Sequence, residues 1–66
     1  SDCKKAVGLA QKGYAVTQNN RAVLVVGICG CKEKNAGWAK WAYSRSAAGQ
    51  KKSLQGLCSK NGIDLN

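Results

Sequence analysis

The chain has 66 residues, of which eleven are Lys or Arg and three are Asp or Glu, so its formal net charge is +8 at pH 7. A chain of this length forms one small domain with a marginal core, and its longest apolar run, over residues 22–29, is far too short to span a membrane. The positive charge attracts phosphates, anionic lipid and acidic polysaccharide and opposes self-association, which predicts a monomer.

The first predicted element is a helix over about residues 2–12. Its apolar residues follow the helical spacing i, i+3, i+4 and i+7: Cys3, Ala6, Val7 and Ala10. Ser1 or Asp2 can cap the start of this helix, and Gly13 is a typical residue for its end.

Two strands joined by a tight hairpin turn are predicted next. Residues 14–18 alternate weakly between apolar and polar side chains, and Asn19 and Asn20 tolerate the positive φ that a hairpin turn requires. Residues 21–31 are rich in Val and Ile and apolar on both faces of an extended chain, which favours a central strand.

A third strand and a second helix are expected after a polar turn over residues 32–37. The aromatic side chains of segment 38–43 favour the strand, with a helical turn as the alternative. The second helix covers about residues 46–61, where Ser44 or Ser46 can cap its start and apolar side chains mark its buried side.

The last predicted element is a short edge strand over residues 63–65. The order α-β-β-β-α-β describes a small two-layer α+β sandwich, in which both helices cover one face of an antiparallel sheet. We expect this sandwich to be a single disulfide-stabilised domain over residues 1–66.

Four cysteines predict two disulfides: Cys3, Cys29, Cys31 and Cys58. Because residues two apart on a strand point to the same face, the central pair would tie both helices to the same strand. A bridge between Cys29 and Cys31 is excluded, since it would close a loop of one residue across an extended strand whose Cβ atoms lie too far apart. The spacing leaves the other two connectivities open.

Disulfides persist in oxidising compartments, so the cysteine content predicts a secreted protein. The start at Ser1, without an initiator Met or an apolar targeting run, fits a mature form whose signal peptide has been removed, although an arbitrary start would look the same. A zinc site is disfavoured, because the chain offers one C-x-C pair, two distant cysteines and no His. No cofactor is predicted.

Three short motifs carry a resemblance to known proteins. Asp2-Cys3 opens a helix, Gly-Tyr-x-Val over residues 13–16 precedes a basic turn, and Val-Gly-Ile-Cys over residues 26–29 ends a long strand. This layout is similar to the killer-toxin-like and necrosis-inducing families of small secreted fungal proteins. The resemblance covers most of residues 2–31 and, more loosely, the final helix.

The resemblance implies a disulfide-tied α/β sandwich with cytotoxicity towards competing microbes or effects on host tissue. The helix-to-strand disulfide of these families falls on Cys3 and Cys29, which leaves Cys31 to pair with Cys58. Segment 38–43 matches no motif of these families, and no active residues are transferred.

Catalysis is not expected. The only acidic residues are Asp2, Glu33 and Asp64, and general acid–base chemistry most often needs a His or a paired carboxylate. The strongest binding candidate is instead the segment over residues 32–45, where cations interleave with aromatic rings. With two lysines of the second helix, the predicted membrane- or target-binding residues are Lys32, Lys34, Trp38, Lys40, Trp41, Tyr43, Arg45, Lys51 and Lys52.

The competing interpretation is that Trp38 or Trp41 belongs to the core of a chain that lacks Phe. Taken together, these features predict a secreted cationic toxin or antimicrobial effector that acts at an anionic microbial envelope or a surface target. The alternative is a non-toxic secreted effector or binding module, directed to a host target or to nucleic acid with tryptophans as stacking platforms.

Overall fold

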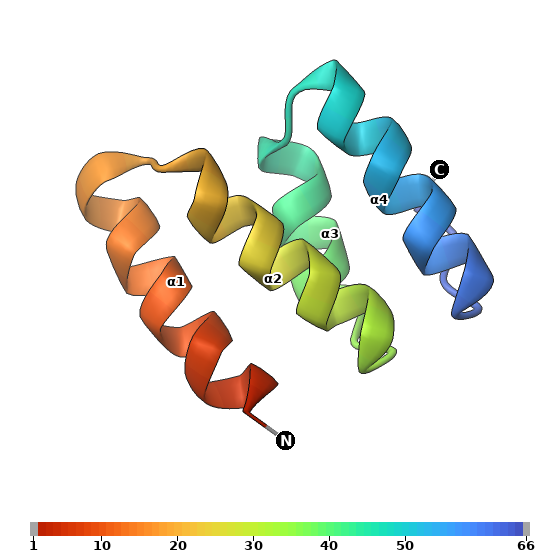
Figure 1. The fold of residues 1–66 in the computed structure, drawn as a ribbon, viewed down its shortest axis with the longest axis horizontal. Coiled ribbons are helices and arrows are strands. Elements are labelled where there is room, and N and C mark those ends of the chain that lie inside the picture. The colour runs from red at the N-terminus through yellow and green to blue at the C-terminus, as the bar shows by residue number, and fades with distance from the viewer. Residues whose placement is uncertain (1, 66) are drawn as a thin grey trace.

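In the computed structural model, which describes residues 2–65, the chain folds into four helices joined by short turns (Figure 1). The helices are α1 (Cys3–Thr17), α2 (Asn20–Lys32), α3 (Ala36–Arg45) and α4 (Ala48–Lys60). No strand occurs within the described residues. The predicted α+β sandwich is therefore wrong, and so is the α/β fold that the family resemblance implies.

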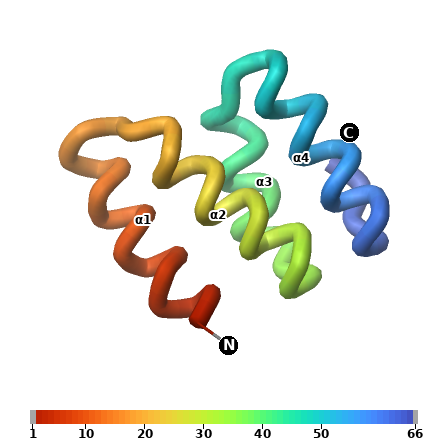
Figure 2. Tube along the Cα trace, in the orientation of Figure 1, coloured from red at the N-terminus to blue at the C-terminus, as the bar shows by residue number. Residues whose placement is uncertain are grey.

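Helix α2 is the centre of the molecule and contacts each of the other three helices. Viewed along the shortest axis of the molecule, α1, α2 and α4 lie side by side, and α3 lies behind them (Figure 1). The chain path shows α1 and α2 as an antiparallel helical hairpin (Figure 2). The result is a flat molecule, with principal extents of 30 × 28 × 14 Å.

The predicted central strand over residues 21–31 is helix α2. Its buried residues lie at the spacing i, i+3, i+4, i+7 and i+8, which is one side of a helix: Val23, Val26, Gly27, Gly30 and Cys31. Although Val and Ile favour strands, most helical stability in a protein comes from packing one face of the helix, and here that packing prevails over propensity.

The asparagines predicted to turn a hairpin instead separate two helices. The Asn19 side chain accepts a hydrogen bond from the backbone N–H of Arg21 at 2.7 Å and so caps α2. Helix α1 does not stop at Gly13 but continues to Thr17 and ends at Gln18 in the left-handed conformation, with φ of 51°. The predicted strand over residues 14–18 is thus the last turn of α1 and its C-cap.

The predicted caps of the first helix are not supported. The Asp2 side chain makes no cap hydrogen bond to α1, and Ser1 lies outside the described residues.

Segment 38–43 belongs to helix α3, so the helical alternative is correct and the predicted strand is wrong. The Asn35 side chain caps α3 by accepting a hydrogen bond from the backbone N–H of Trp38 at 3.1 Å. Helix α4 was predicted within two residues at its start and one at its end, but neither predicted serine is its N-cap. That position is Ala47, whose backbone N–H donates to Gln50 Oε1 at 3.2 Å.

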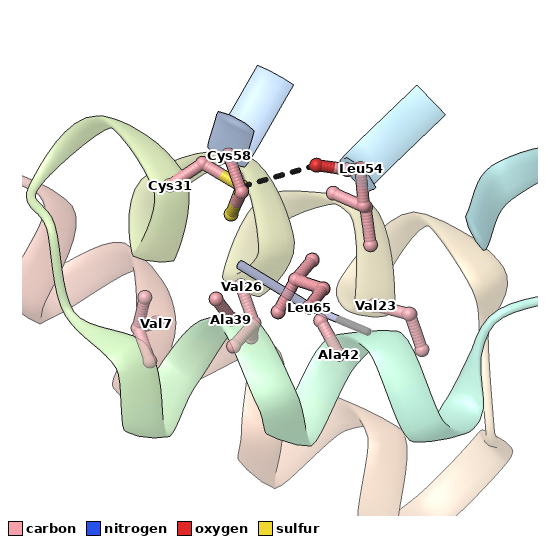
Figure 3. Close-up of a cluster of buried hydrophobic side chains, with 9 residues drawn as sticks. All are labelled: Val7, Val23, Val26, Cys31, Ala39, Ala42, Leu54, Cys58 and Leu65. Carbon is pink, nitrogen blue, oxygen red and sulfur yellow. Dashed lines mark hydrogen bonds between the residues drawn. A yellow bond between two sulfur atoms is a disulfide. The ribbon is translucent and has the colours of Figure 1, made fainter. Parts of the chain in front are cut away.

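The hydrophobic core receives side chains from all four helices and from the C-terminal segment (Figure 3). The predicted edge strand over residues 63–65 does not form, and Leu65 packs into this core with 8% of its surface exposed. The core residues are Val7, Val23, Val26, Cys31, Ala39, Ala42, Leu54, Cys58 and Leu65.

Small residues let α2 and α3 approach closely. A Cβ atom on Gly30 would lie 2.5 Å from the backbone nitrogen of Ala39, and one on Gly27 would lie 3.1 Å from the Cβ of Ala42. Because the backbones themselves meet at Gly30, only glycine fits there without a shift of one helix.

The disulfides join Cys3 to Cys29 and Cys31 to Cys58, which is the pairing that the resemblance implies. Both bridges start from one central element, as expected, but this element is a helix. Residues two apart on a helix are rotated by about 200°, so the sulfurs of Cys29 and Cys31 point to opposite sides instead of one. One bridge ties α1 to α2, and the other ties α4 to α2.

Candidate functional site

Helix α3 carries the aromatic side chains of the predicted binding segment on two flanks of its buried face. Ala39 and Ala42 are fully buried and mark the middle of that face. By the helical step of about 100° per residue, Trp38 and Trp41 lie on one flank and Tyr43 on the other. All three rings are half-buried and pack against the core.

On the first flank, two rings and a guanidinium group form what we call the Arg45 cluster, made of Tyr14, Trp41 and Arg45. The rings of Tyr14 and Trp41 meet edge to face with centroids 5.3 Å apart. The Arg45 guanidinium carbon lies 4.3 Å from the centroid of the Trp41 ring and 5.9 Å from that of Tyr14. Arg45 Nη1 also donates a hydrogen bond to the Trp41 carbonyl oxygen at 3.0 Å, in the last turn of α3.

On the second flank, Tyr43 is held by two residues of α4. The Lys51 Nζ atom lies 5.3 Å from the centroid of the Tyr43 ring, and Gln55 Nε2 donates a hydrogen bond to the Tyr43 hydroxyl oxygen at 2.8 Å. These contacts use both the face and the polar tip of the tyrosine to join α3 to α4.

Trp38 and Trp41 lie at the boundary between the core and the surface. Each tryptophan contacts the core with one part and remains partly accessible with another. The Trp41 ring is engaged by Tyr14 and Arg45. The aromatic rings of α3 thus contribute to joining the helices of the bundle.

The predicted cations do not gather on α3. Lys32 ends α2, Lys34 lies in the following turn with φ of 56°, and Lys40 lies on α3. Lys52, on α4, borders an open depression of about 780 Å³ between α4 and residues 62–65. Every Lys and Arg of the chain is exposed except Lys51, which is half-buried, so the positive charge is spread around the molecule.

Two partners of the aromatic rings were missed in the sequence, namely Tyr14 and Gln55. Each comes from a different helix than its partner, and no local pattern marks it. The pair Trp41–Arg45 has the helical spacing i, i+4 and was recognisable once this segment was assigned to a helix.

A second group was also missed. Four large apolar side chains are exposed on α1 and α2: Leu9, Val16, Val25 and Ile28.

The cysteines and the other ligand-type side chains were compared with the requirements of a metal site. All four cysteines are bonded in disulfides, and no three His, Cys, Asp or Glu side chains within residues 2–65 form a group that could hold a metal ion. Among the same residues, none of the helices is long and apolar enough to cross a membrane.

The Arg45 cluster makes a modest, measurable contribution to stability. We expect Arg45→Ala to lower the free energy of unfolding by roughly 0.5–1 kcal/mol, the typical range for an exposed cation–π contact. The wavelength of the tryptophan fluorescence maximum of the folded protein should also shift, because the Trp41 ring no longer has the guanidinium group over it. The control is Lys40→Ala, which removes another exposed cation from the same helix and should change neither quantity. Equal effects of the two substitutions would contradict the cluster.

Comparison of the chain with models of protein families, with curated proteins and with solved structures finds no match.

Proposed function

We propose that the protein is a secreted cationic toxin or antimicrobial effector that binds the anionic surface of a microbial envelope. The observation that carries this proposal is a net charge of +8 on a flat bundle of 66 residues with nearly all of its cations exposed. Each basic side chain near an anionic membrane is worth about 1 kcal/mol, so even a few of these cations acting together support useful affinity.

The two disulfides support a site of action outside the cell. Structural disulfides are typical of secreted small domains, and both bridges here hold helices to the central helix α2. A frame of this kind keeps the cations in a fixed arrangement without a large core.

The geometry of the aromatic rings favours a charged surface as the partner over single-stranded nucleic acid. Stacking of bases requires free aromatic faces. Of the two predicted platforms, Trp41 has Arg45 of the same chain over its ring, and Trp38 packs against the core. Tyr43 has Lys51 over its ring. An oligonucleotide titration is therefore the control for the proposal, and we expect weak binding.

The proposal is tested with vesicles that contain phosphatidylglycerol and with vesicles of phosphatidylcholine alone. We expect binding to the anionic vesicles only, with a steep loss as NaCl rises from about 0.05 to 0.5 M, because salt screens exposed charges over about 10 Å at 0.1 M. The same protein should inhibit the growth of at least one organism in a panel of bacteria and fungi.

Equal binding to neutral vesicles would contradict the proposal. Tight, salt-steep binding to an oligonucleotide without vesicle binding would replace it with the nucleic-acid alternative.

A further inference from the structure

Within residues 2–65, helix α2 presents one side that no other helix covers. Successive residues on a helix are rotated by about 100°, so Cys29, Gly30 and Cys31 point in three directions. These directions are occupied by α1, α3 and α4, through the bridge to Cys3, the contact with Ala39 and the bridge to Cys58. Lys32 points in the fourth direction, which lies opposite α3. No helix of residues 2–65 lies on this side.

Four residues of α2 share this uncovered direction, at the spacing i, i+4, i+7 and i+11: Arg21, Val25, Ile28 and Lys32. Val25 and Ile28 are 38% and 39% exposed, although α2 has three neighbouring helices. A cation stands at each end of this apolar pair.

Helix α1 continues the same pattern. Leu9 and Val16 are 64% and 82% exposed, and Gly13 lies between them at the spacing i, i+4, i+7. Tyr14 reaches Trp41 of α3, and by helical phase Leu9 and Val16 lie about 140–160° around α1 from Tyr14. They therefore face away from α3, as Val25 and Ile28 do.

The disulfide sets the register of the hairpin, so one residue of each apolar group lies at a similar level along it. Cys3 is bonded to Cys29, so Leu9 and Val25 are six and four residues from the bridge on antiparallel helices. At 1.5 Å per residue their levels along the hairpin differ by only about 3 Å. Figure 1 shows this side of α1 and α2 toward the viewer, with α3 behind it.

We propose that this outer face of the α1–α2 hairpin, defined by Leu9, Gly13, Val16, Val25 and Ile28, enters the interfacial region of an anionic lipid bilayer. The inference rests on the proposed function and specifies which part of the molecule touches the lipid. It assigns contact to a surface other than the aromatic segment on α3.

The charges around the outer face favour an anionic lipid bilayer as its partner. Residues 3–32 contain five cations, and the nearest acidic residues along the chain are Asp2 and Glu33 at the two ends of the hairpin. Lys5 and Lys12 on α1 and Arg21 and Lys32 on α2 stand beside the apolar side chains, so a partner must offer negative charge at its surface and apolar material just beneath. An anionic bilayer has that order, and amphipathic helices bury their apolar face about 5–10 Å into it. A second copy of the chain is disfavoured, because two faces of the same charge would repel.

The experiment compares three variants with the wild type on vesicles of phosphatidylglycerol and phosphatidylcholine. Leu9→Gln with Ile28→Gln removes apolar area from both helices of the outer face, and we expect roughly tenfold weaker partitioning. Gly13→Leu adds apolar area to the same face, where an added side chain meets open space, and should bind several-fold tighter. The control, Ala15→Gln with Ala36→Gln, changes exposed residues outside the face and should bind like the wild type.

The outcomes separate this inference from the proposed function. If wild-type protein does not bind anionic vesicles, the proposed function fails. If it binds and the double Gln variant and Gly13→Leu bind equally well, the function stands and the outer face is not the contact. If sedimentation shows a wild-type dimer that the double Gln variant abolishes while vesicle binding is unchanged, a second copy covers the face and the inference is overturned. Circular dichroism and a thiol count verify that each variant is folded and oxidised.

Discussion

Replacing Cys31 and Cys58 together by alanine should lower the free energy of unfolding by about 3–5 kcal/mol. The bridge closes a sequence separation of 27 residues, and the loop-entropy relation assigns about 3.5 kcal/mol to a loop of that size. Both cysteines are fully buried in the core, so the loss of their sulfur atoms adds a cavity. A domain of this size has little stability to lose, and we expect a large unfolded fraction at 37 °C.

The matched control for this prediction is the other disulfide. Cys3 and Cys29 close a nearly equal separation of 26 residues, but both are only half-buried. Their replacement by alanine should remove a similar entropic stabilisation with a smaller cavity, so this variant should be the more stable of the two. Urea unfolding followed by circular dichroism measures both. A Cys31→Ala and Cys58→Ala variant as stable as the wild type would show that the second bridge is not structural.

The second large effect is expected for Gly30→Ala. The added Cβ would lie 2.5 Å from the backbone nitrogen and 2.9 Å from the Cα of Ala39, and backbone atoms cannot rotate away as a side chain can. Overpacking of a core typically costs about 1–3 kcal/mol, and we expect a value at or above the top of this range because α2 and α3 must separate. Thermal or urea unfolding provides the measurement.

Substitutions at two other glycines test whether the destabilisation by Gly30→Ala comes from the close approach of α2 and α3. At Gly27 the added Cβ would meet the ends of the Leu54 side chain, at 2.6 Å and 3.0 Å, so Gly27→Ala should cost less than Gly30→Ala. Gly49, on the exposed side of α4, has nothing within 4 Å, and Gly49→Ala should stabilise the protein by up to about 1 kcal/mol through helix propensity. Destabilisation by all three would point to a general intolerance of helix α2 and α4 to substitution and against the contact with Ala39.

The terminal helices could be predicted from the sequence and the central part could not. Helix α4 has Leu54, Leu57 and Cys58 at the spacing i, i+3 and i+4, which fits one side of a helix and not one face of a strand, and its predicted range was nearly correct. In α2, two of the five buried positions are Gly27 and Gly30, which carry no apolar side chain. The helical pattern of apolar residues is therefore incomplete in the sequence, and the Val-rich sequence before these glycines favours a strand.

The candidate site was affected by the same misassignment. With residues 38–43 read as a strand, Trp41 and Arg45 share a face but lie about 13 Å apart at roughly 3.3 Å per residue, whereas on helix α3 they stack. The exposed apolar residues of α1 and α2 were not identified in the sequence for a related reason. On a buried central strand Val25 and Ile28 would need no explanation, and they became informative only when α2 was seen to have an uncovered side.

The placement of the two bridges also determines what happens when the backbone is cut. The turn between α1 and α2 lies between Cys3 and Cys29, and the turns on either side of α3 lie between Cys31 and Cys58. Each connection between helices is thus enclosed in a covalent ring. A protease that cleaves any one of these turns leaves two peptides that are still joined by a disulfide. In the proposed extracellular role, such cuts would change the chain's connectivity while the two pieces stay covalently joined.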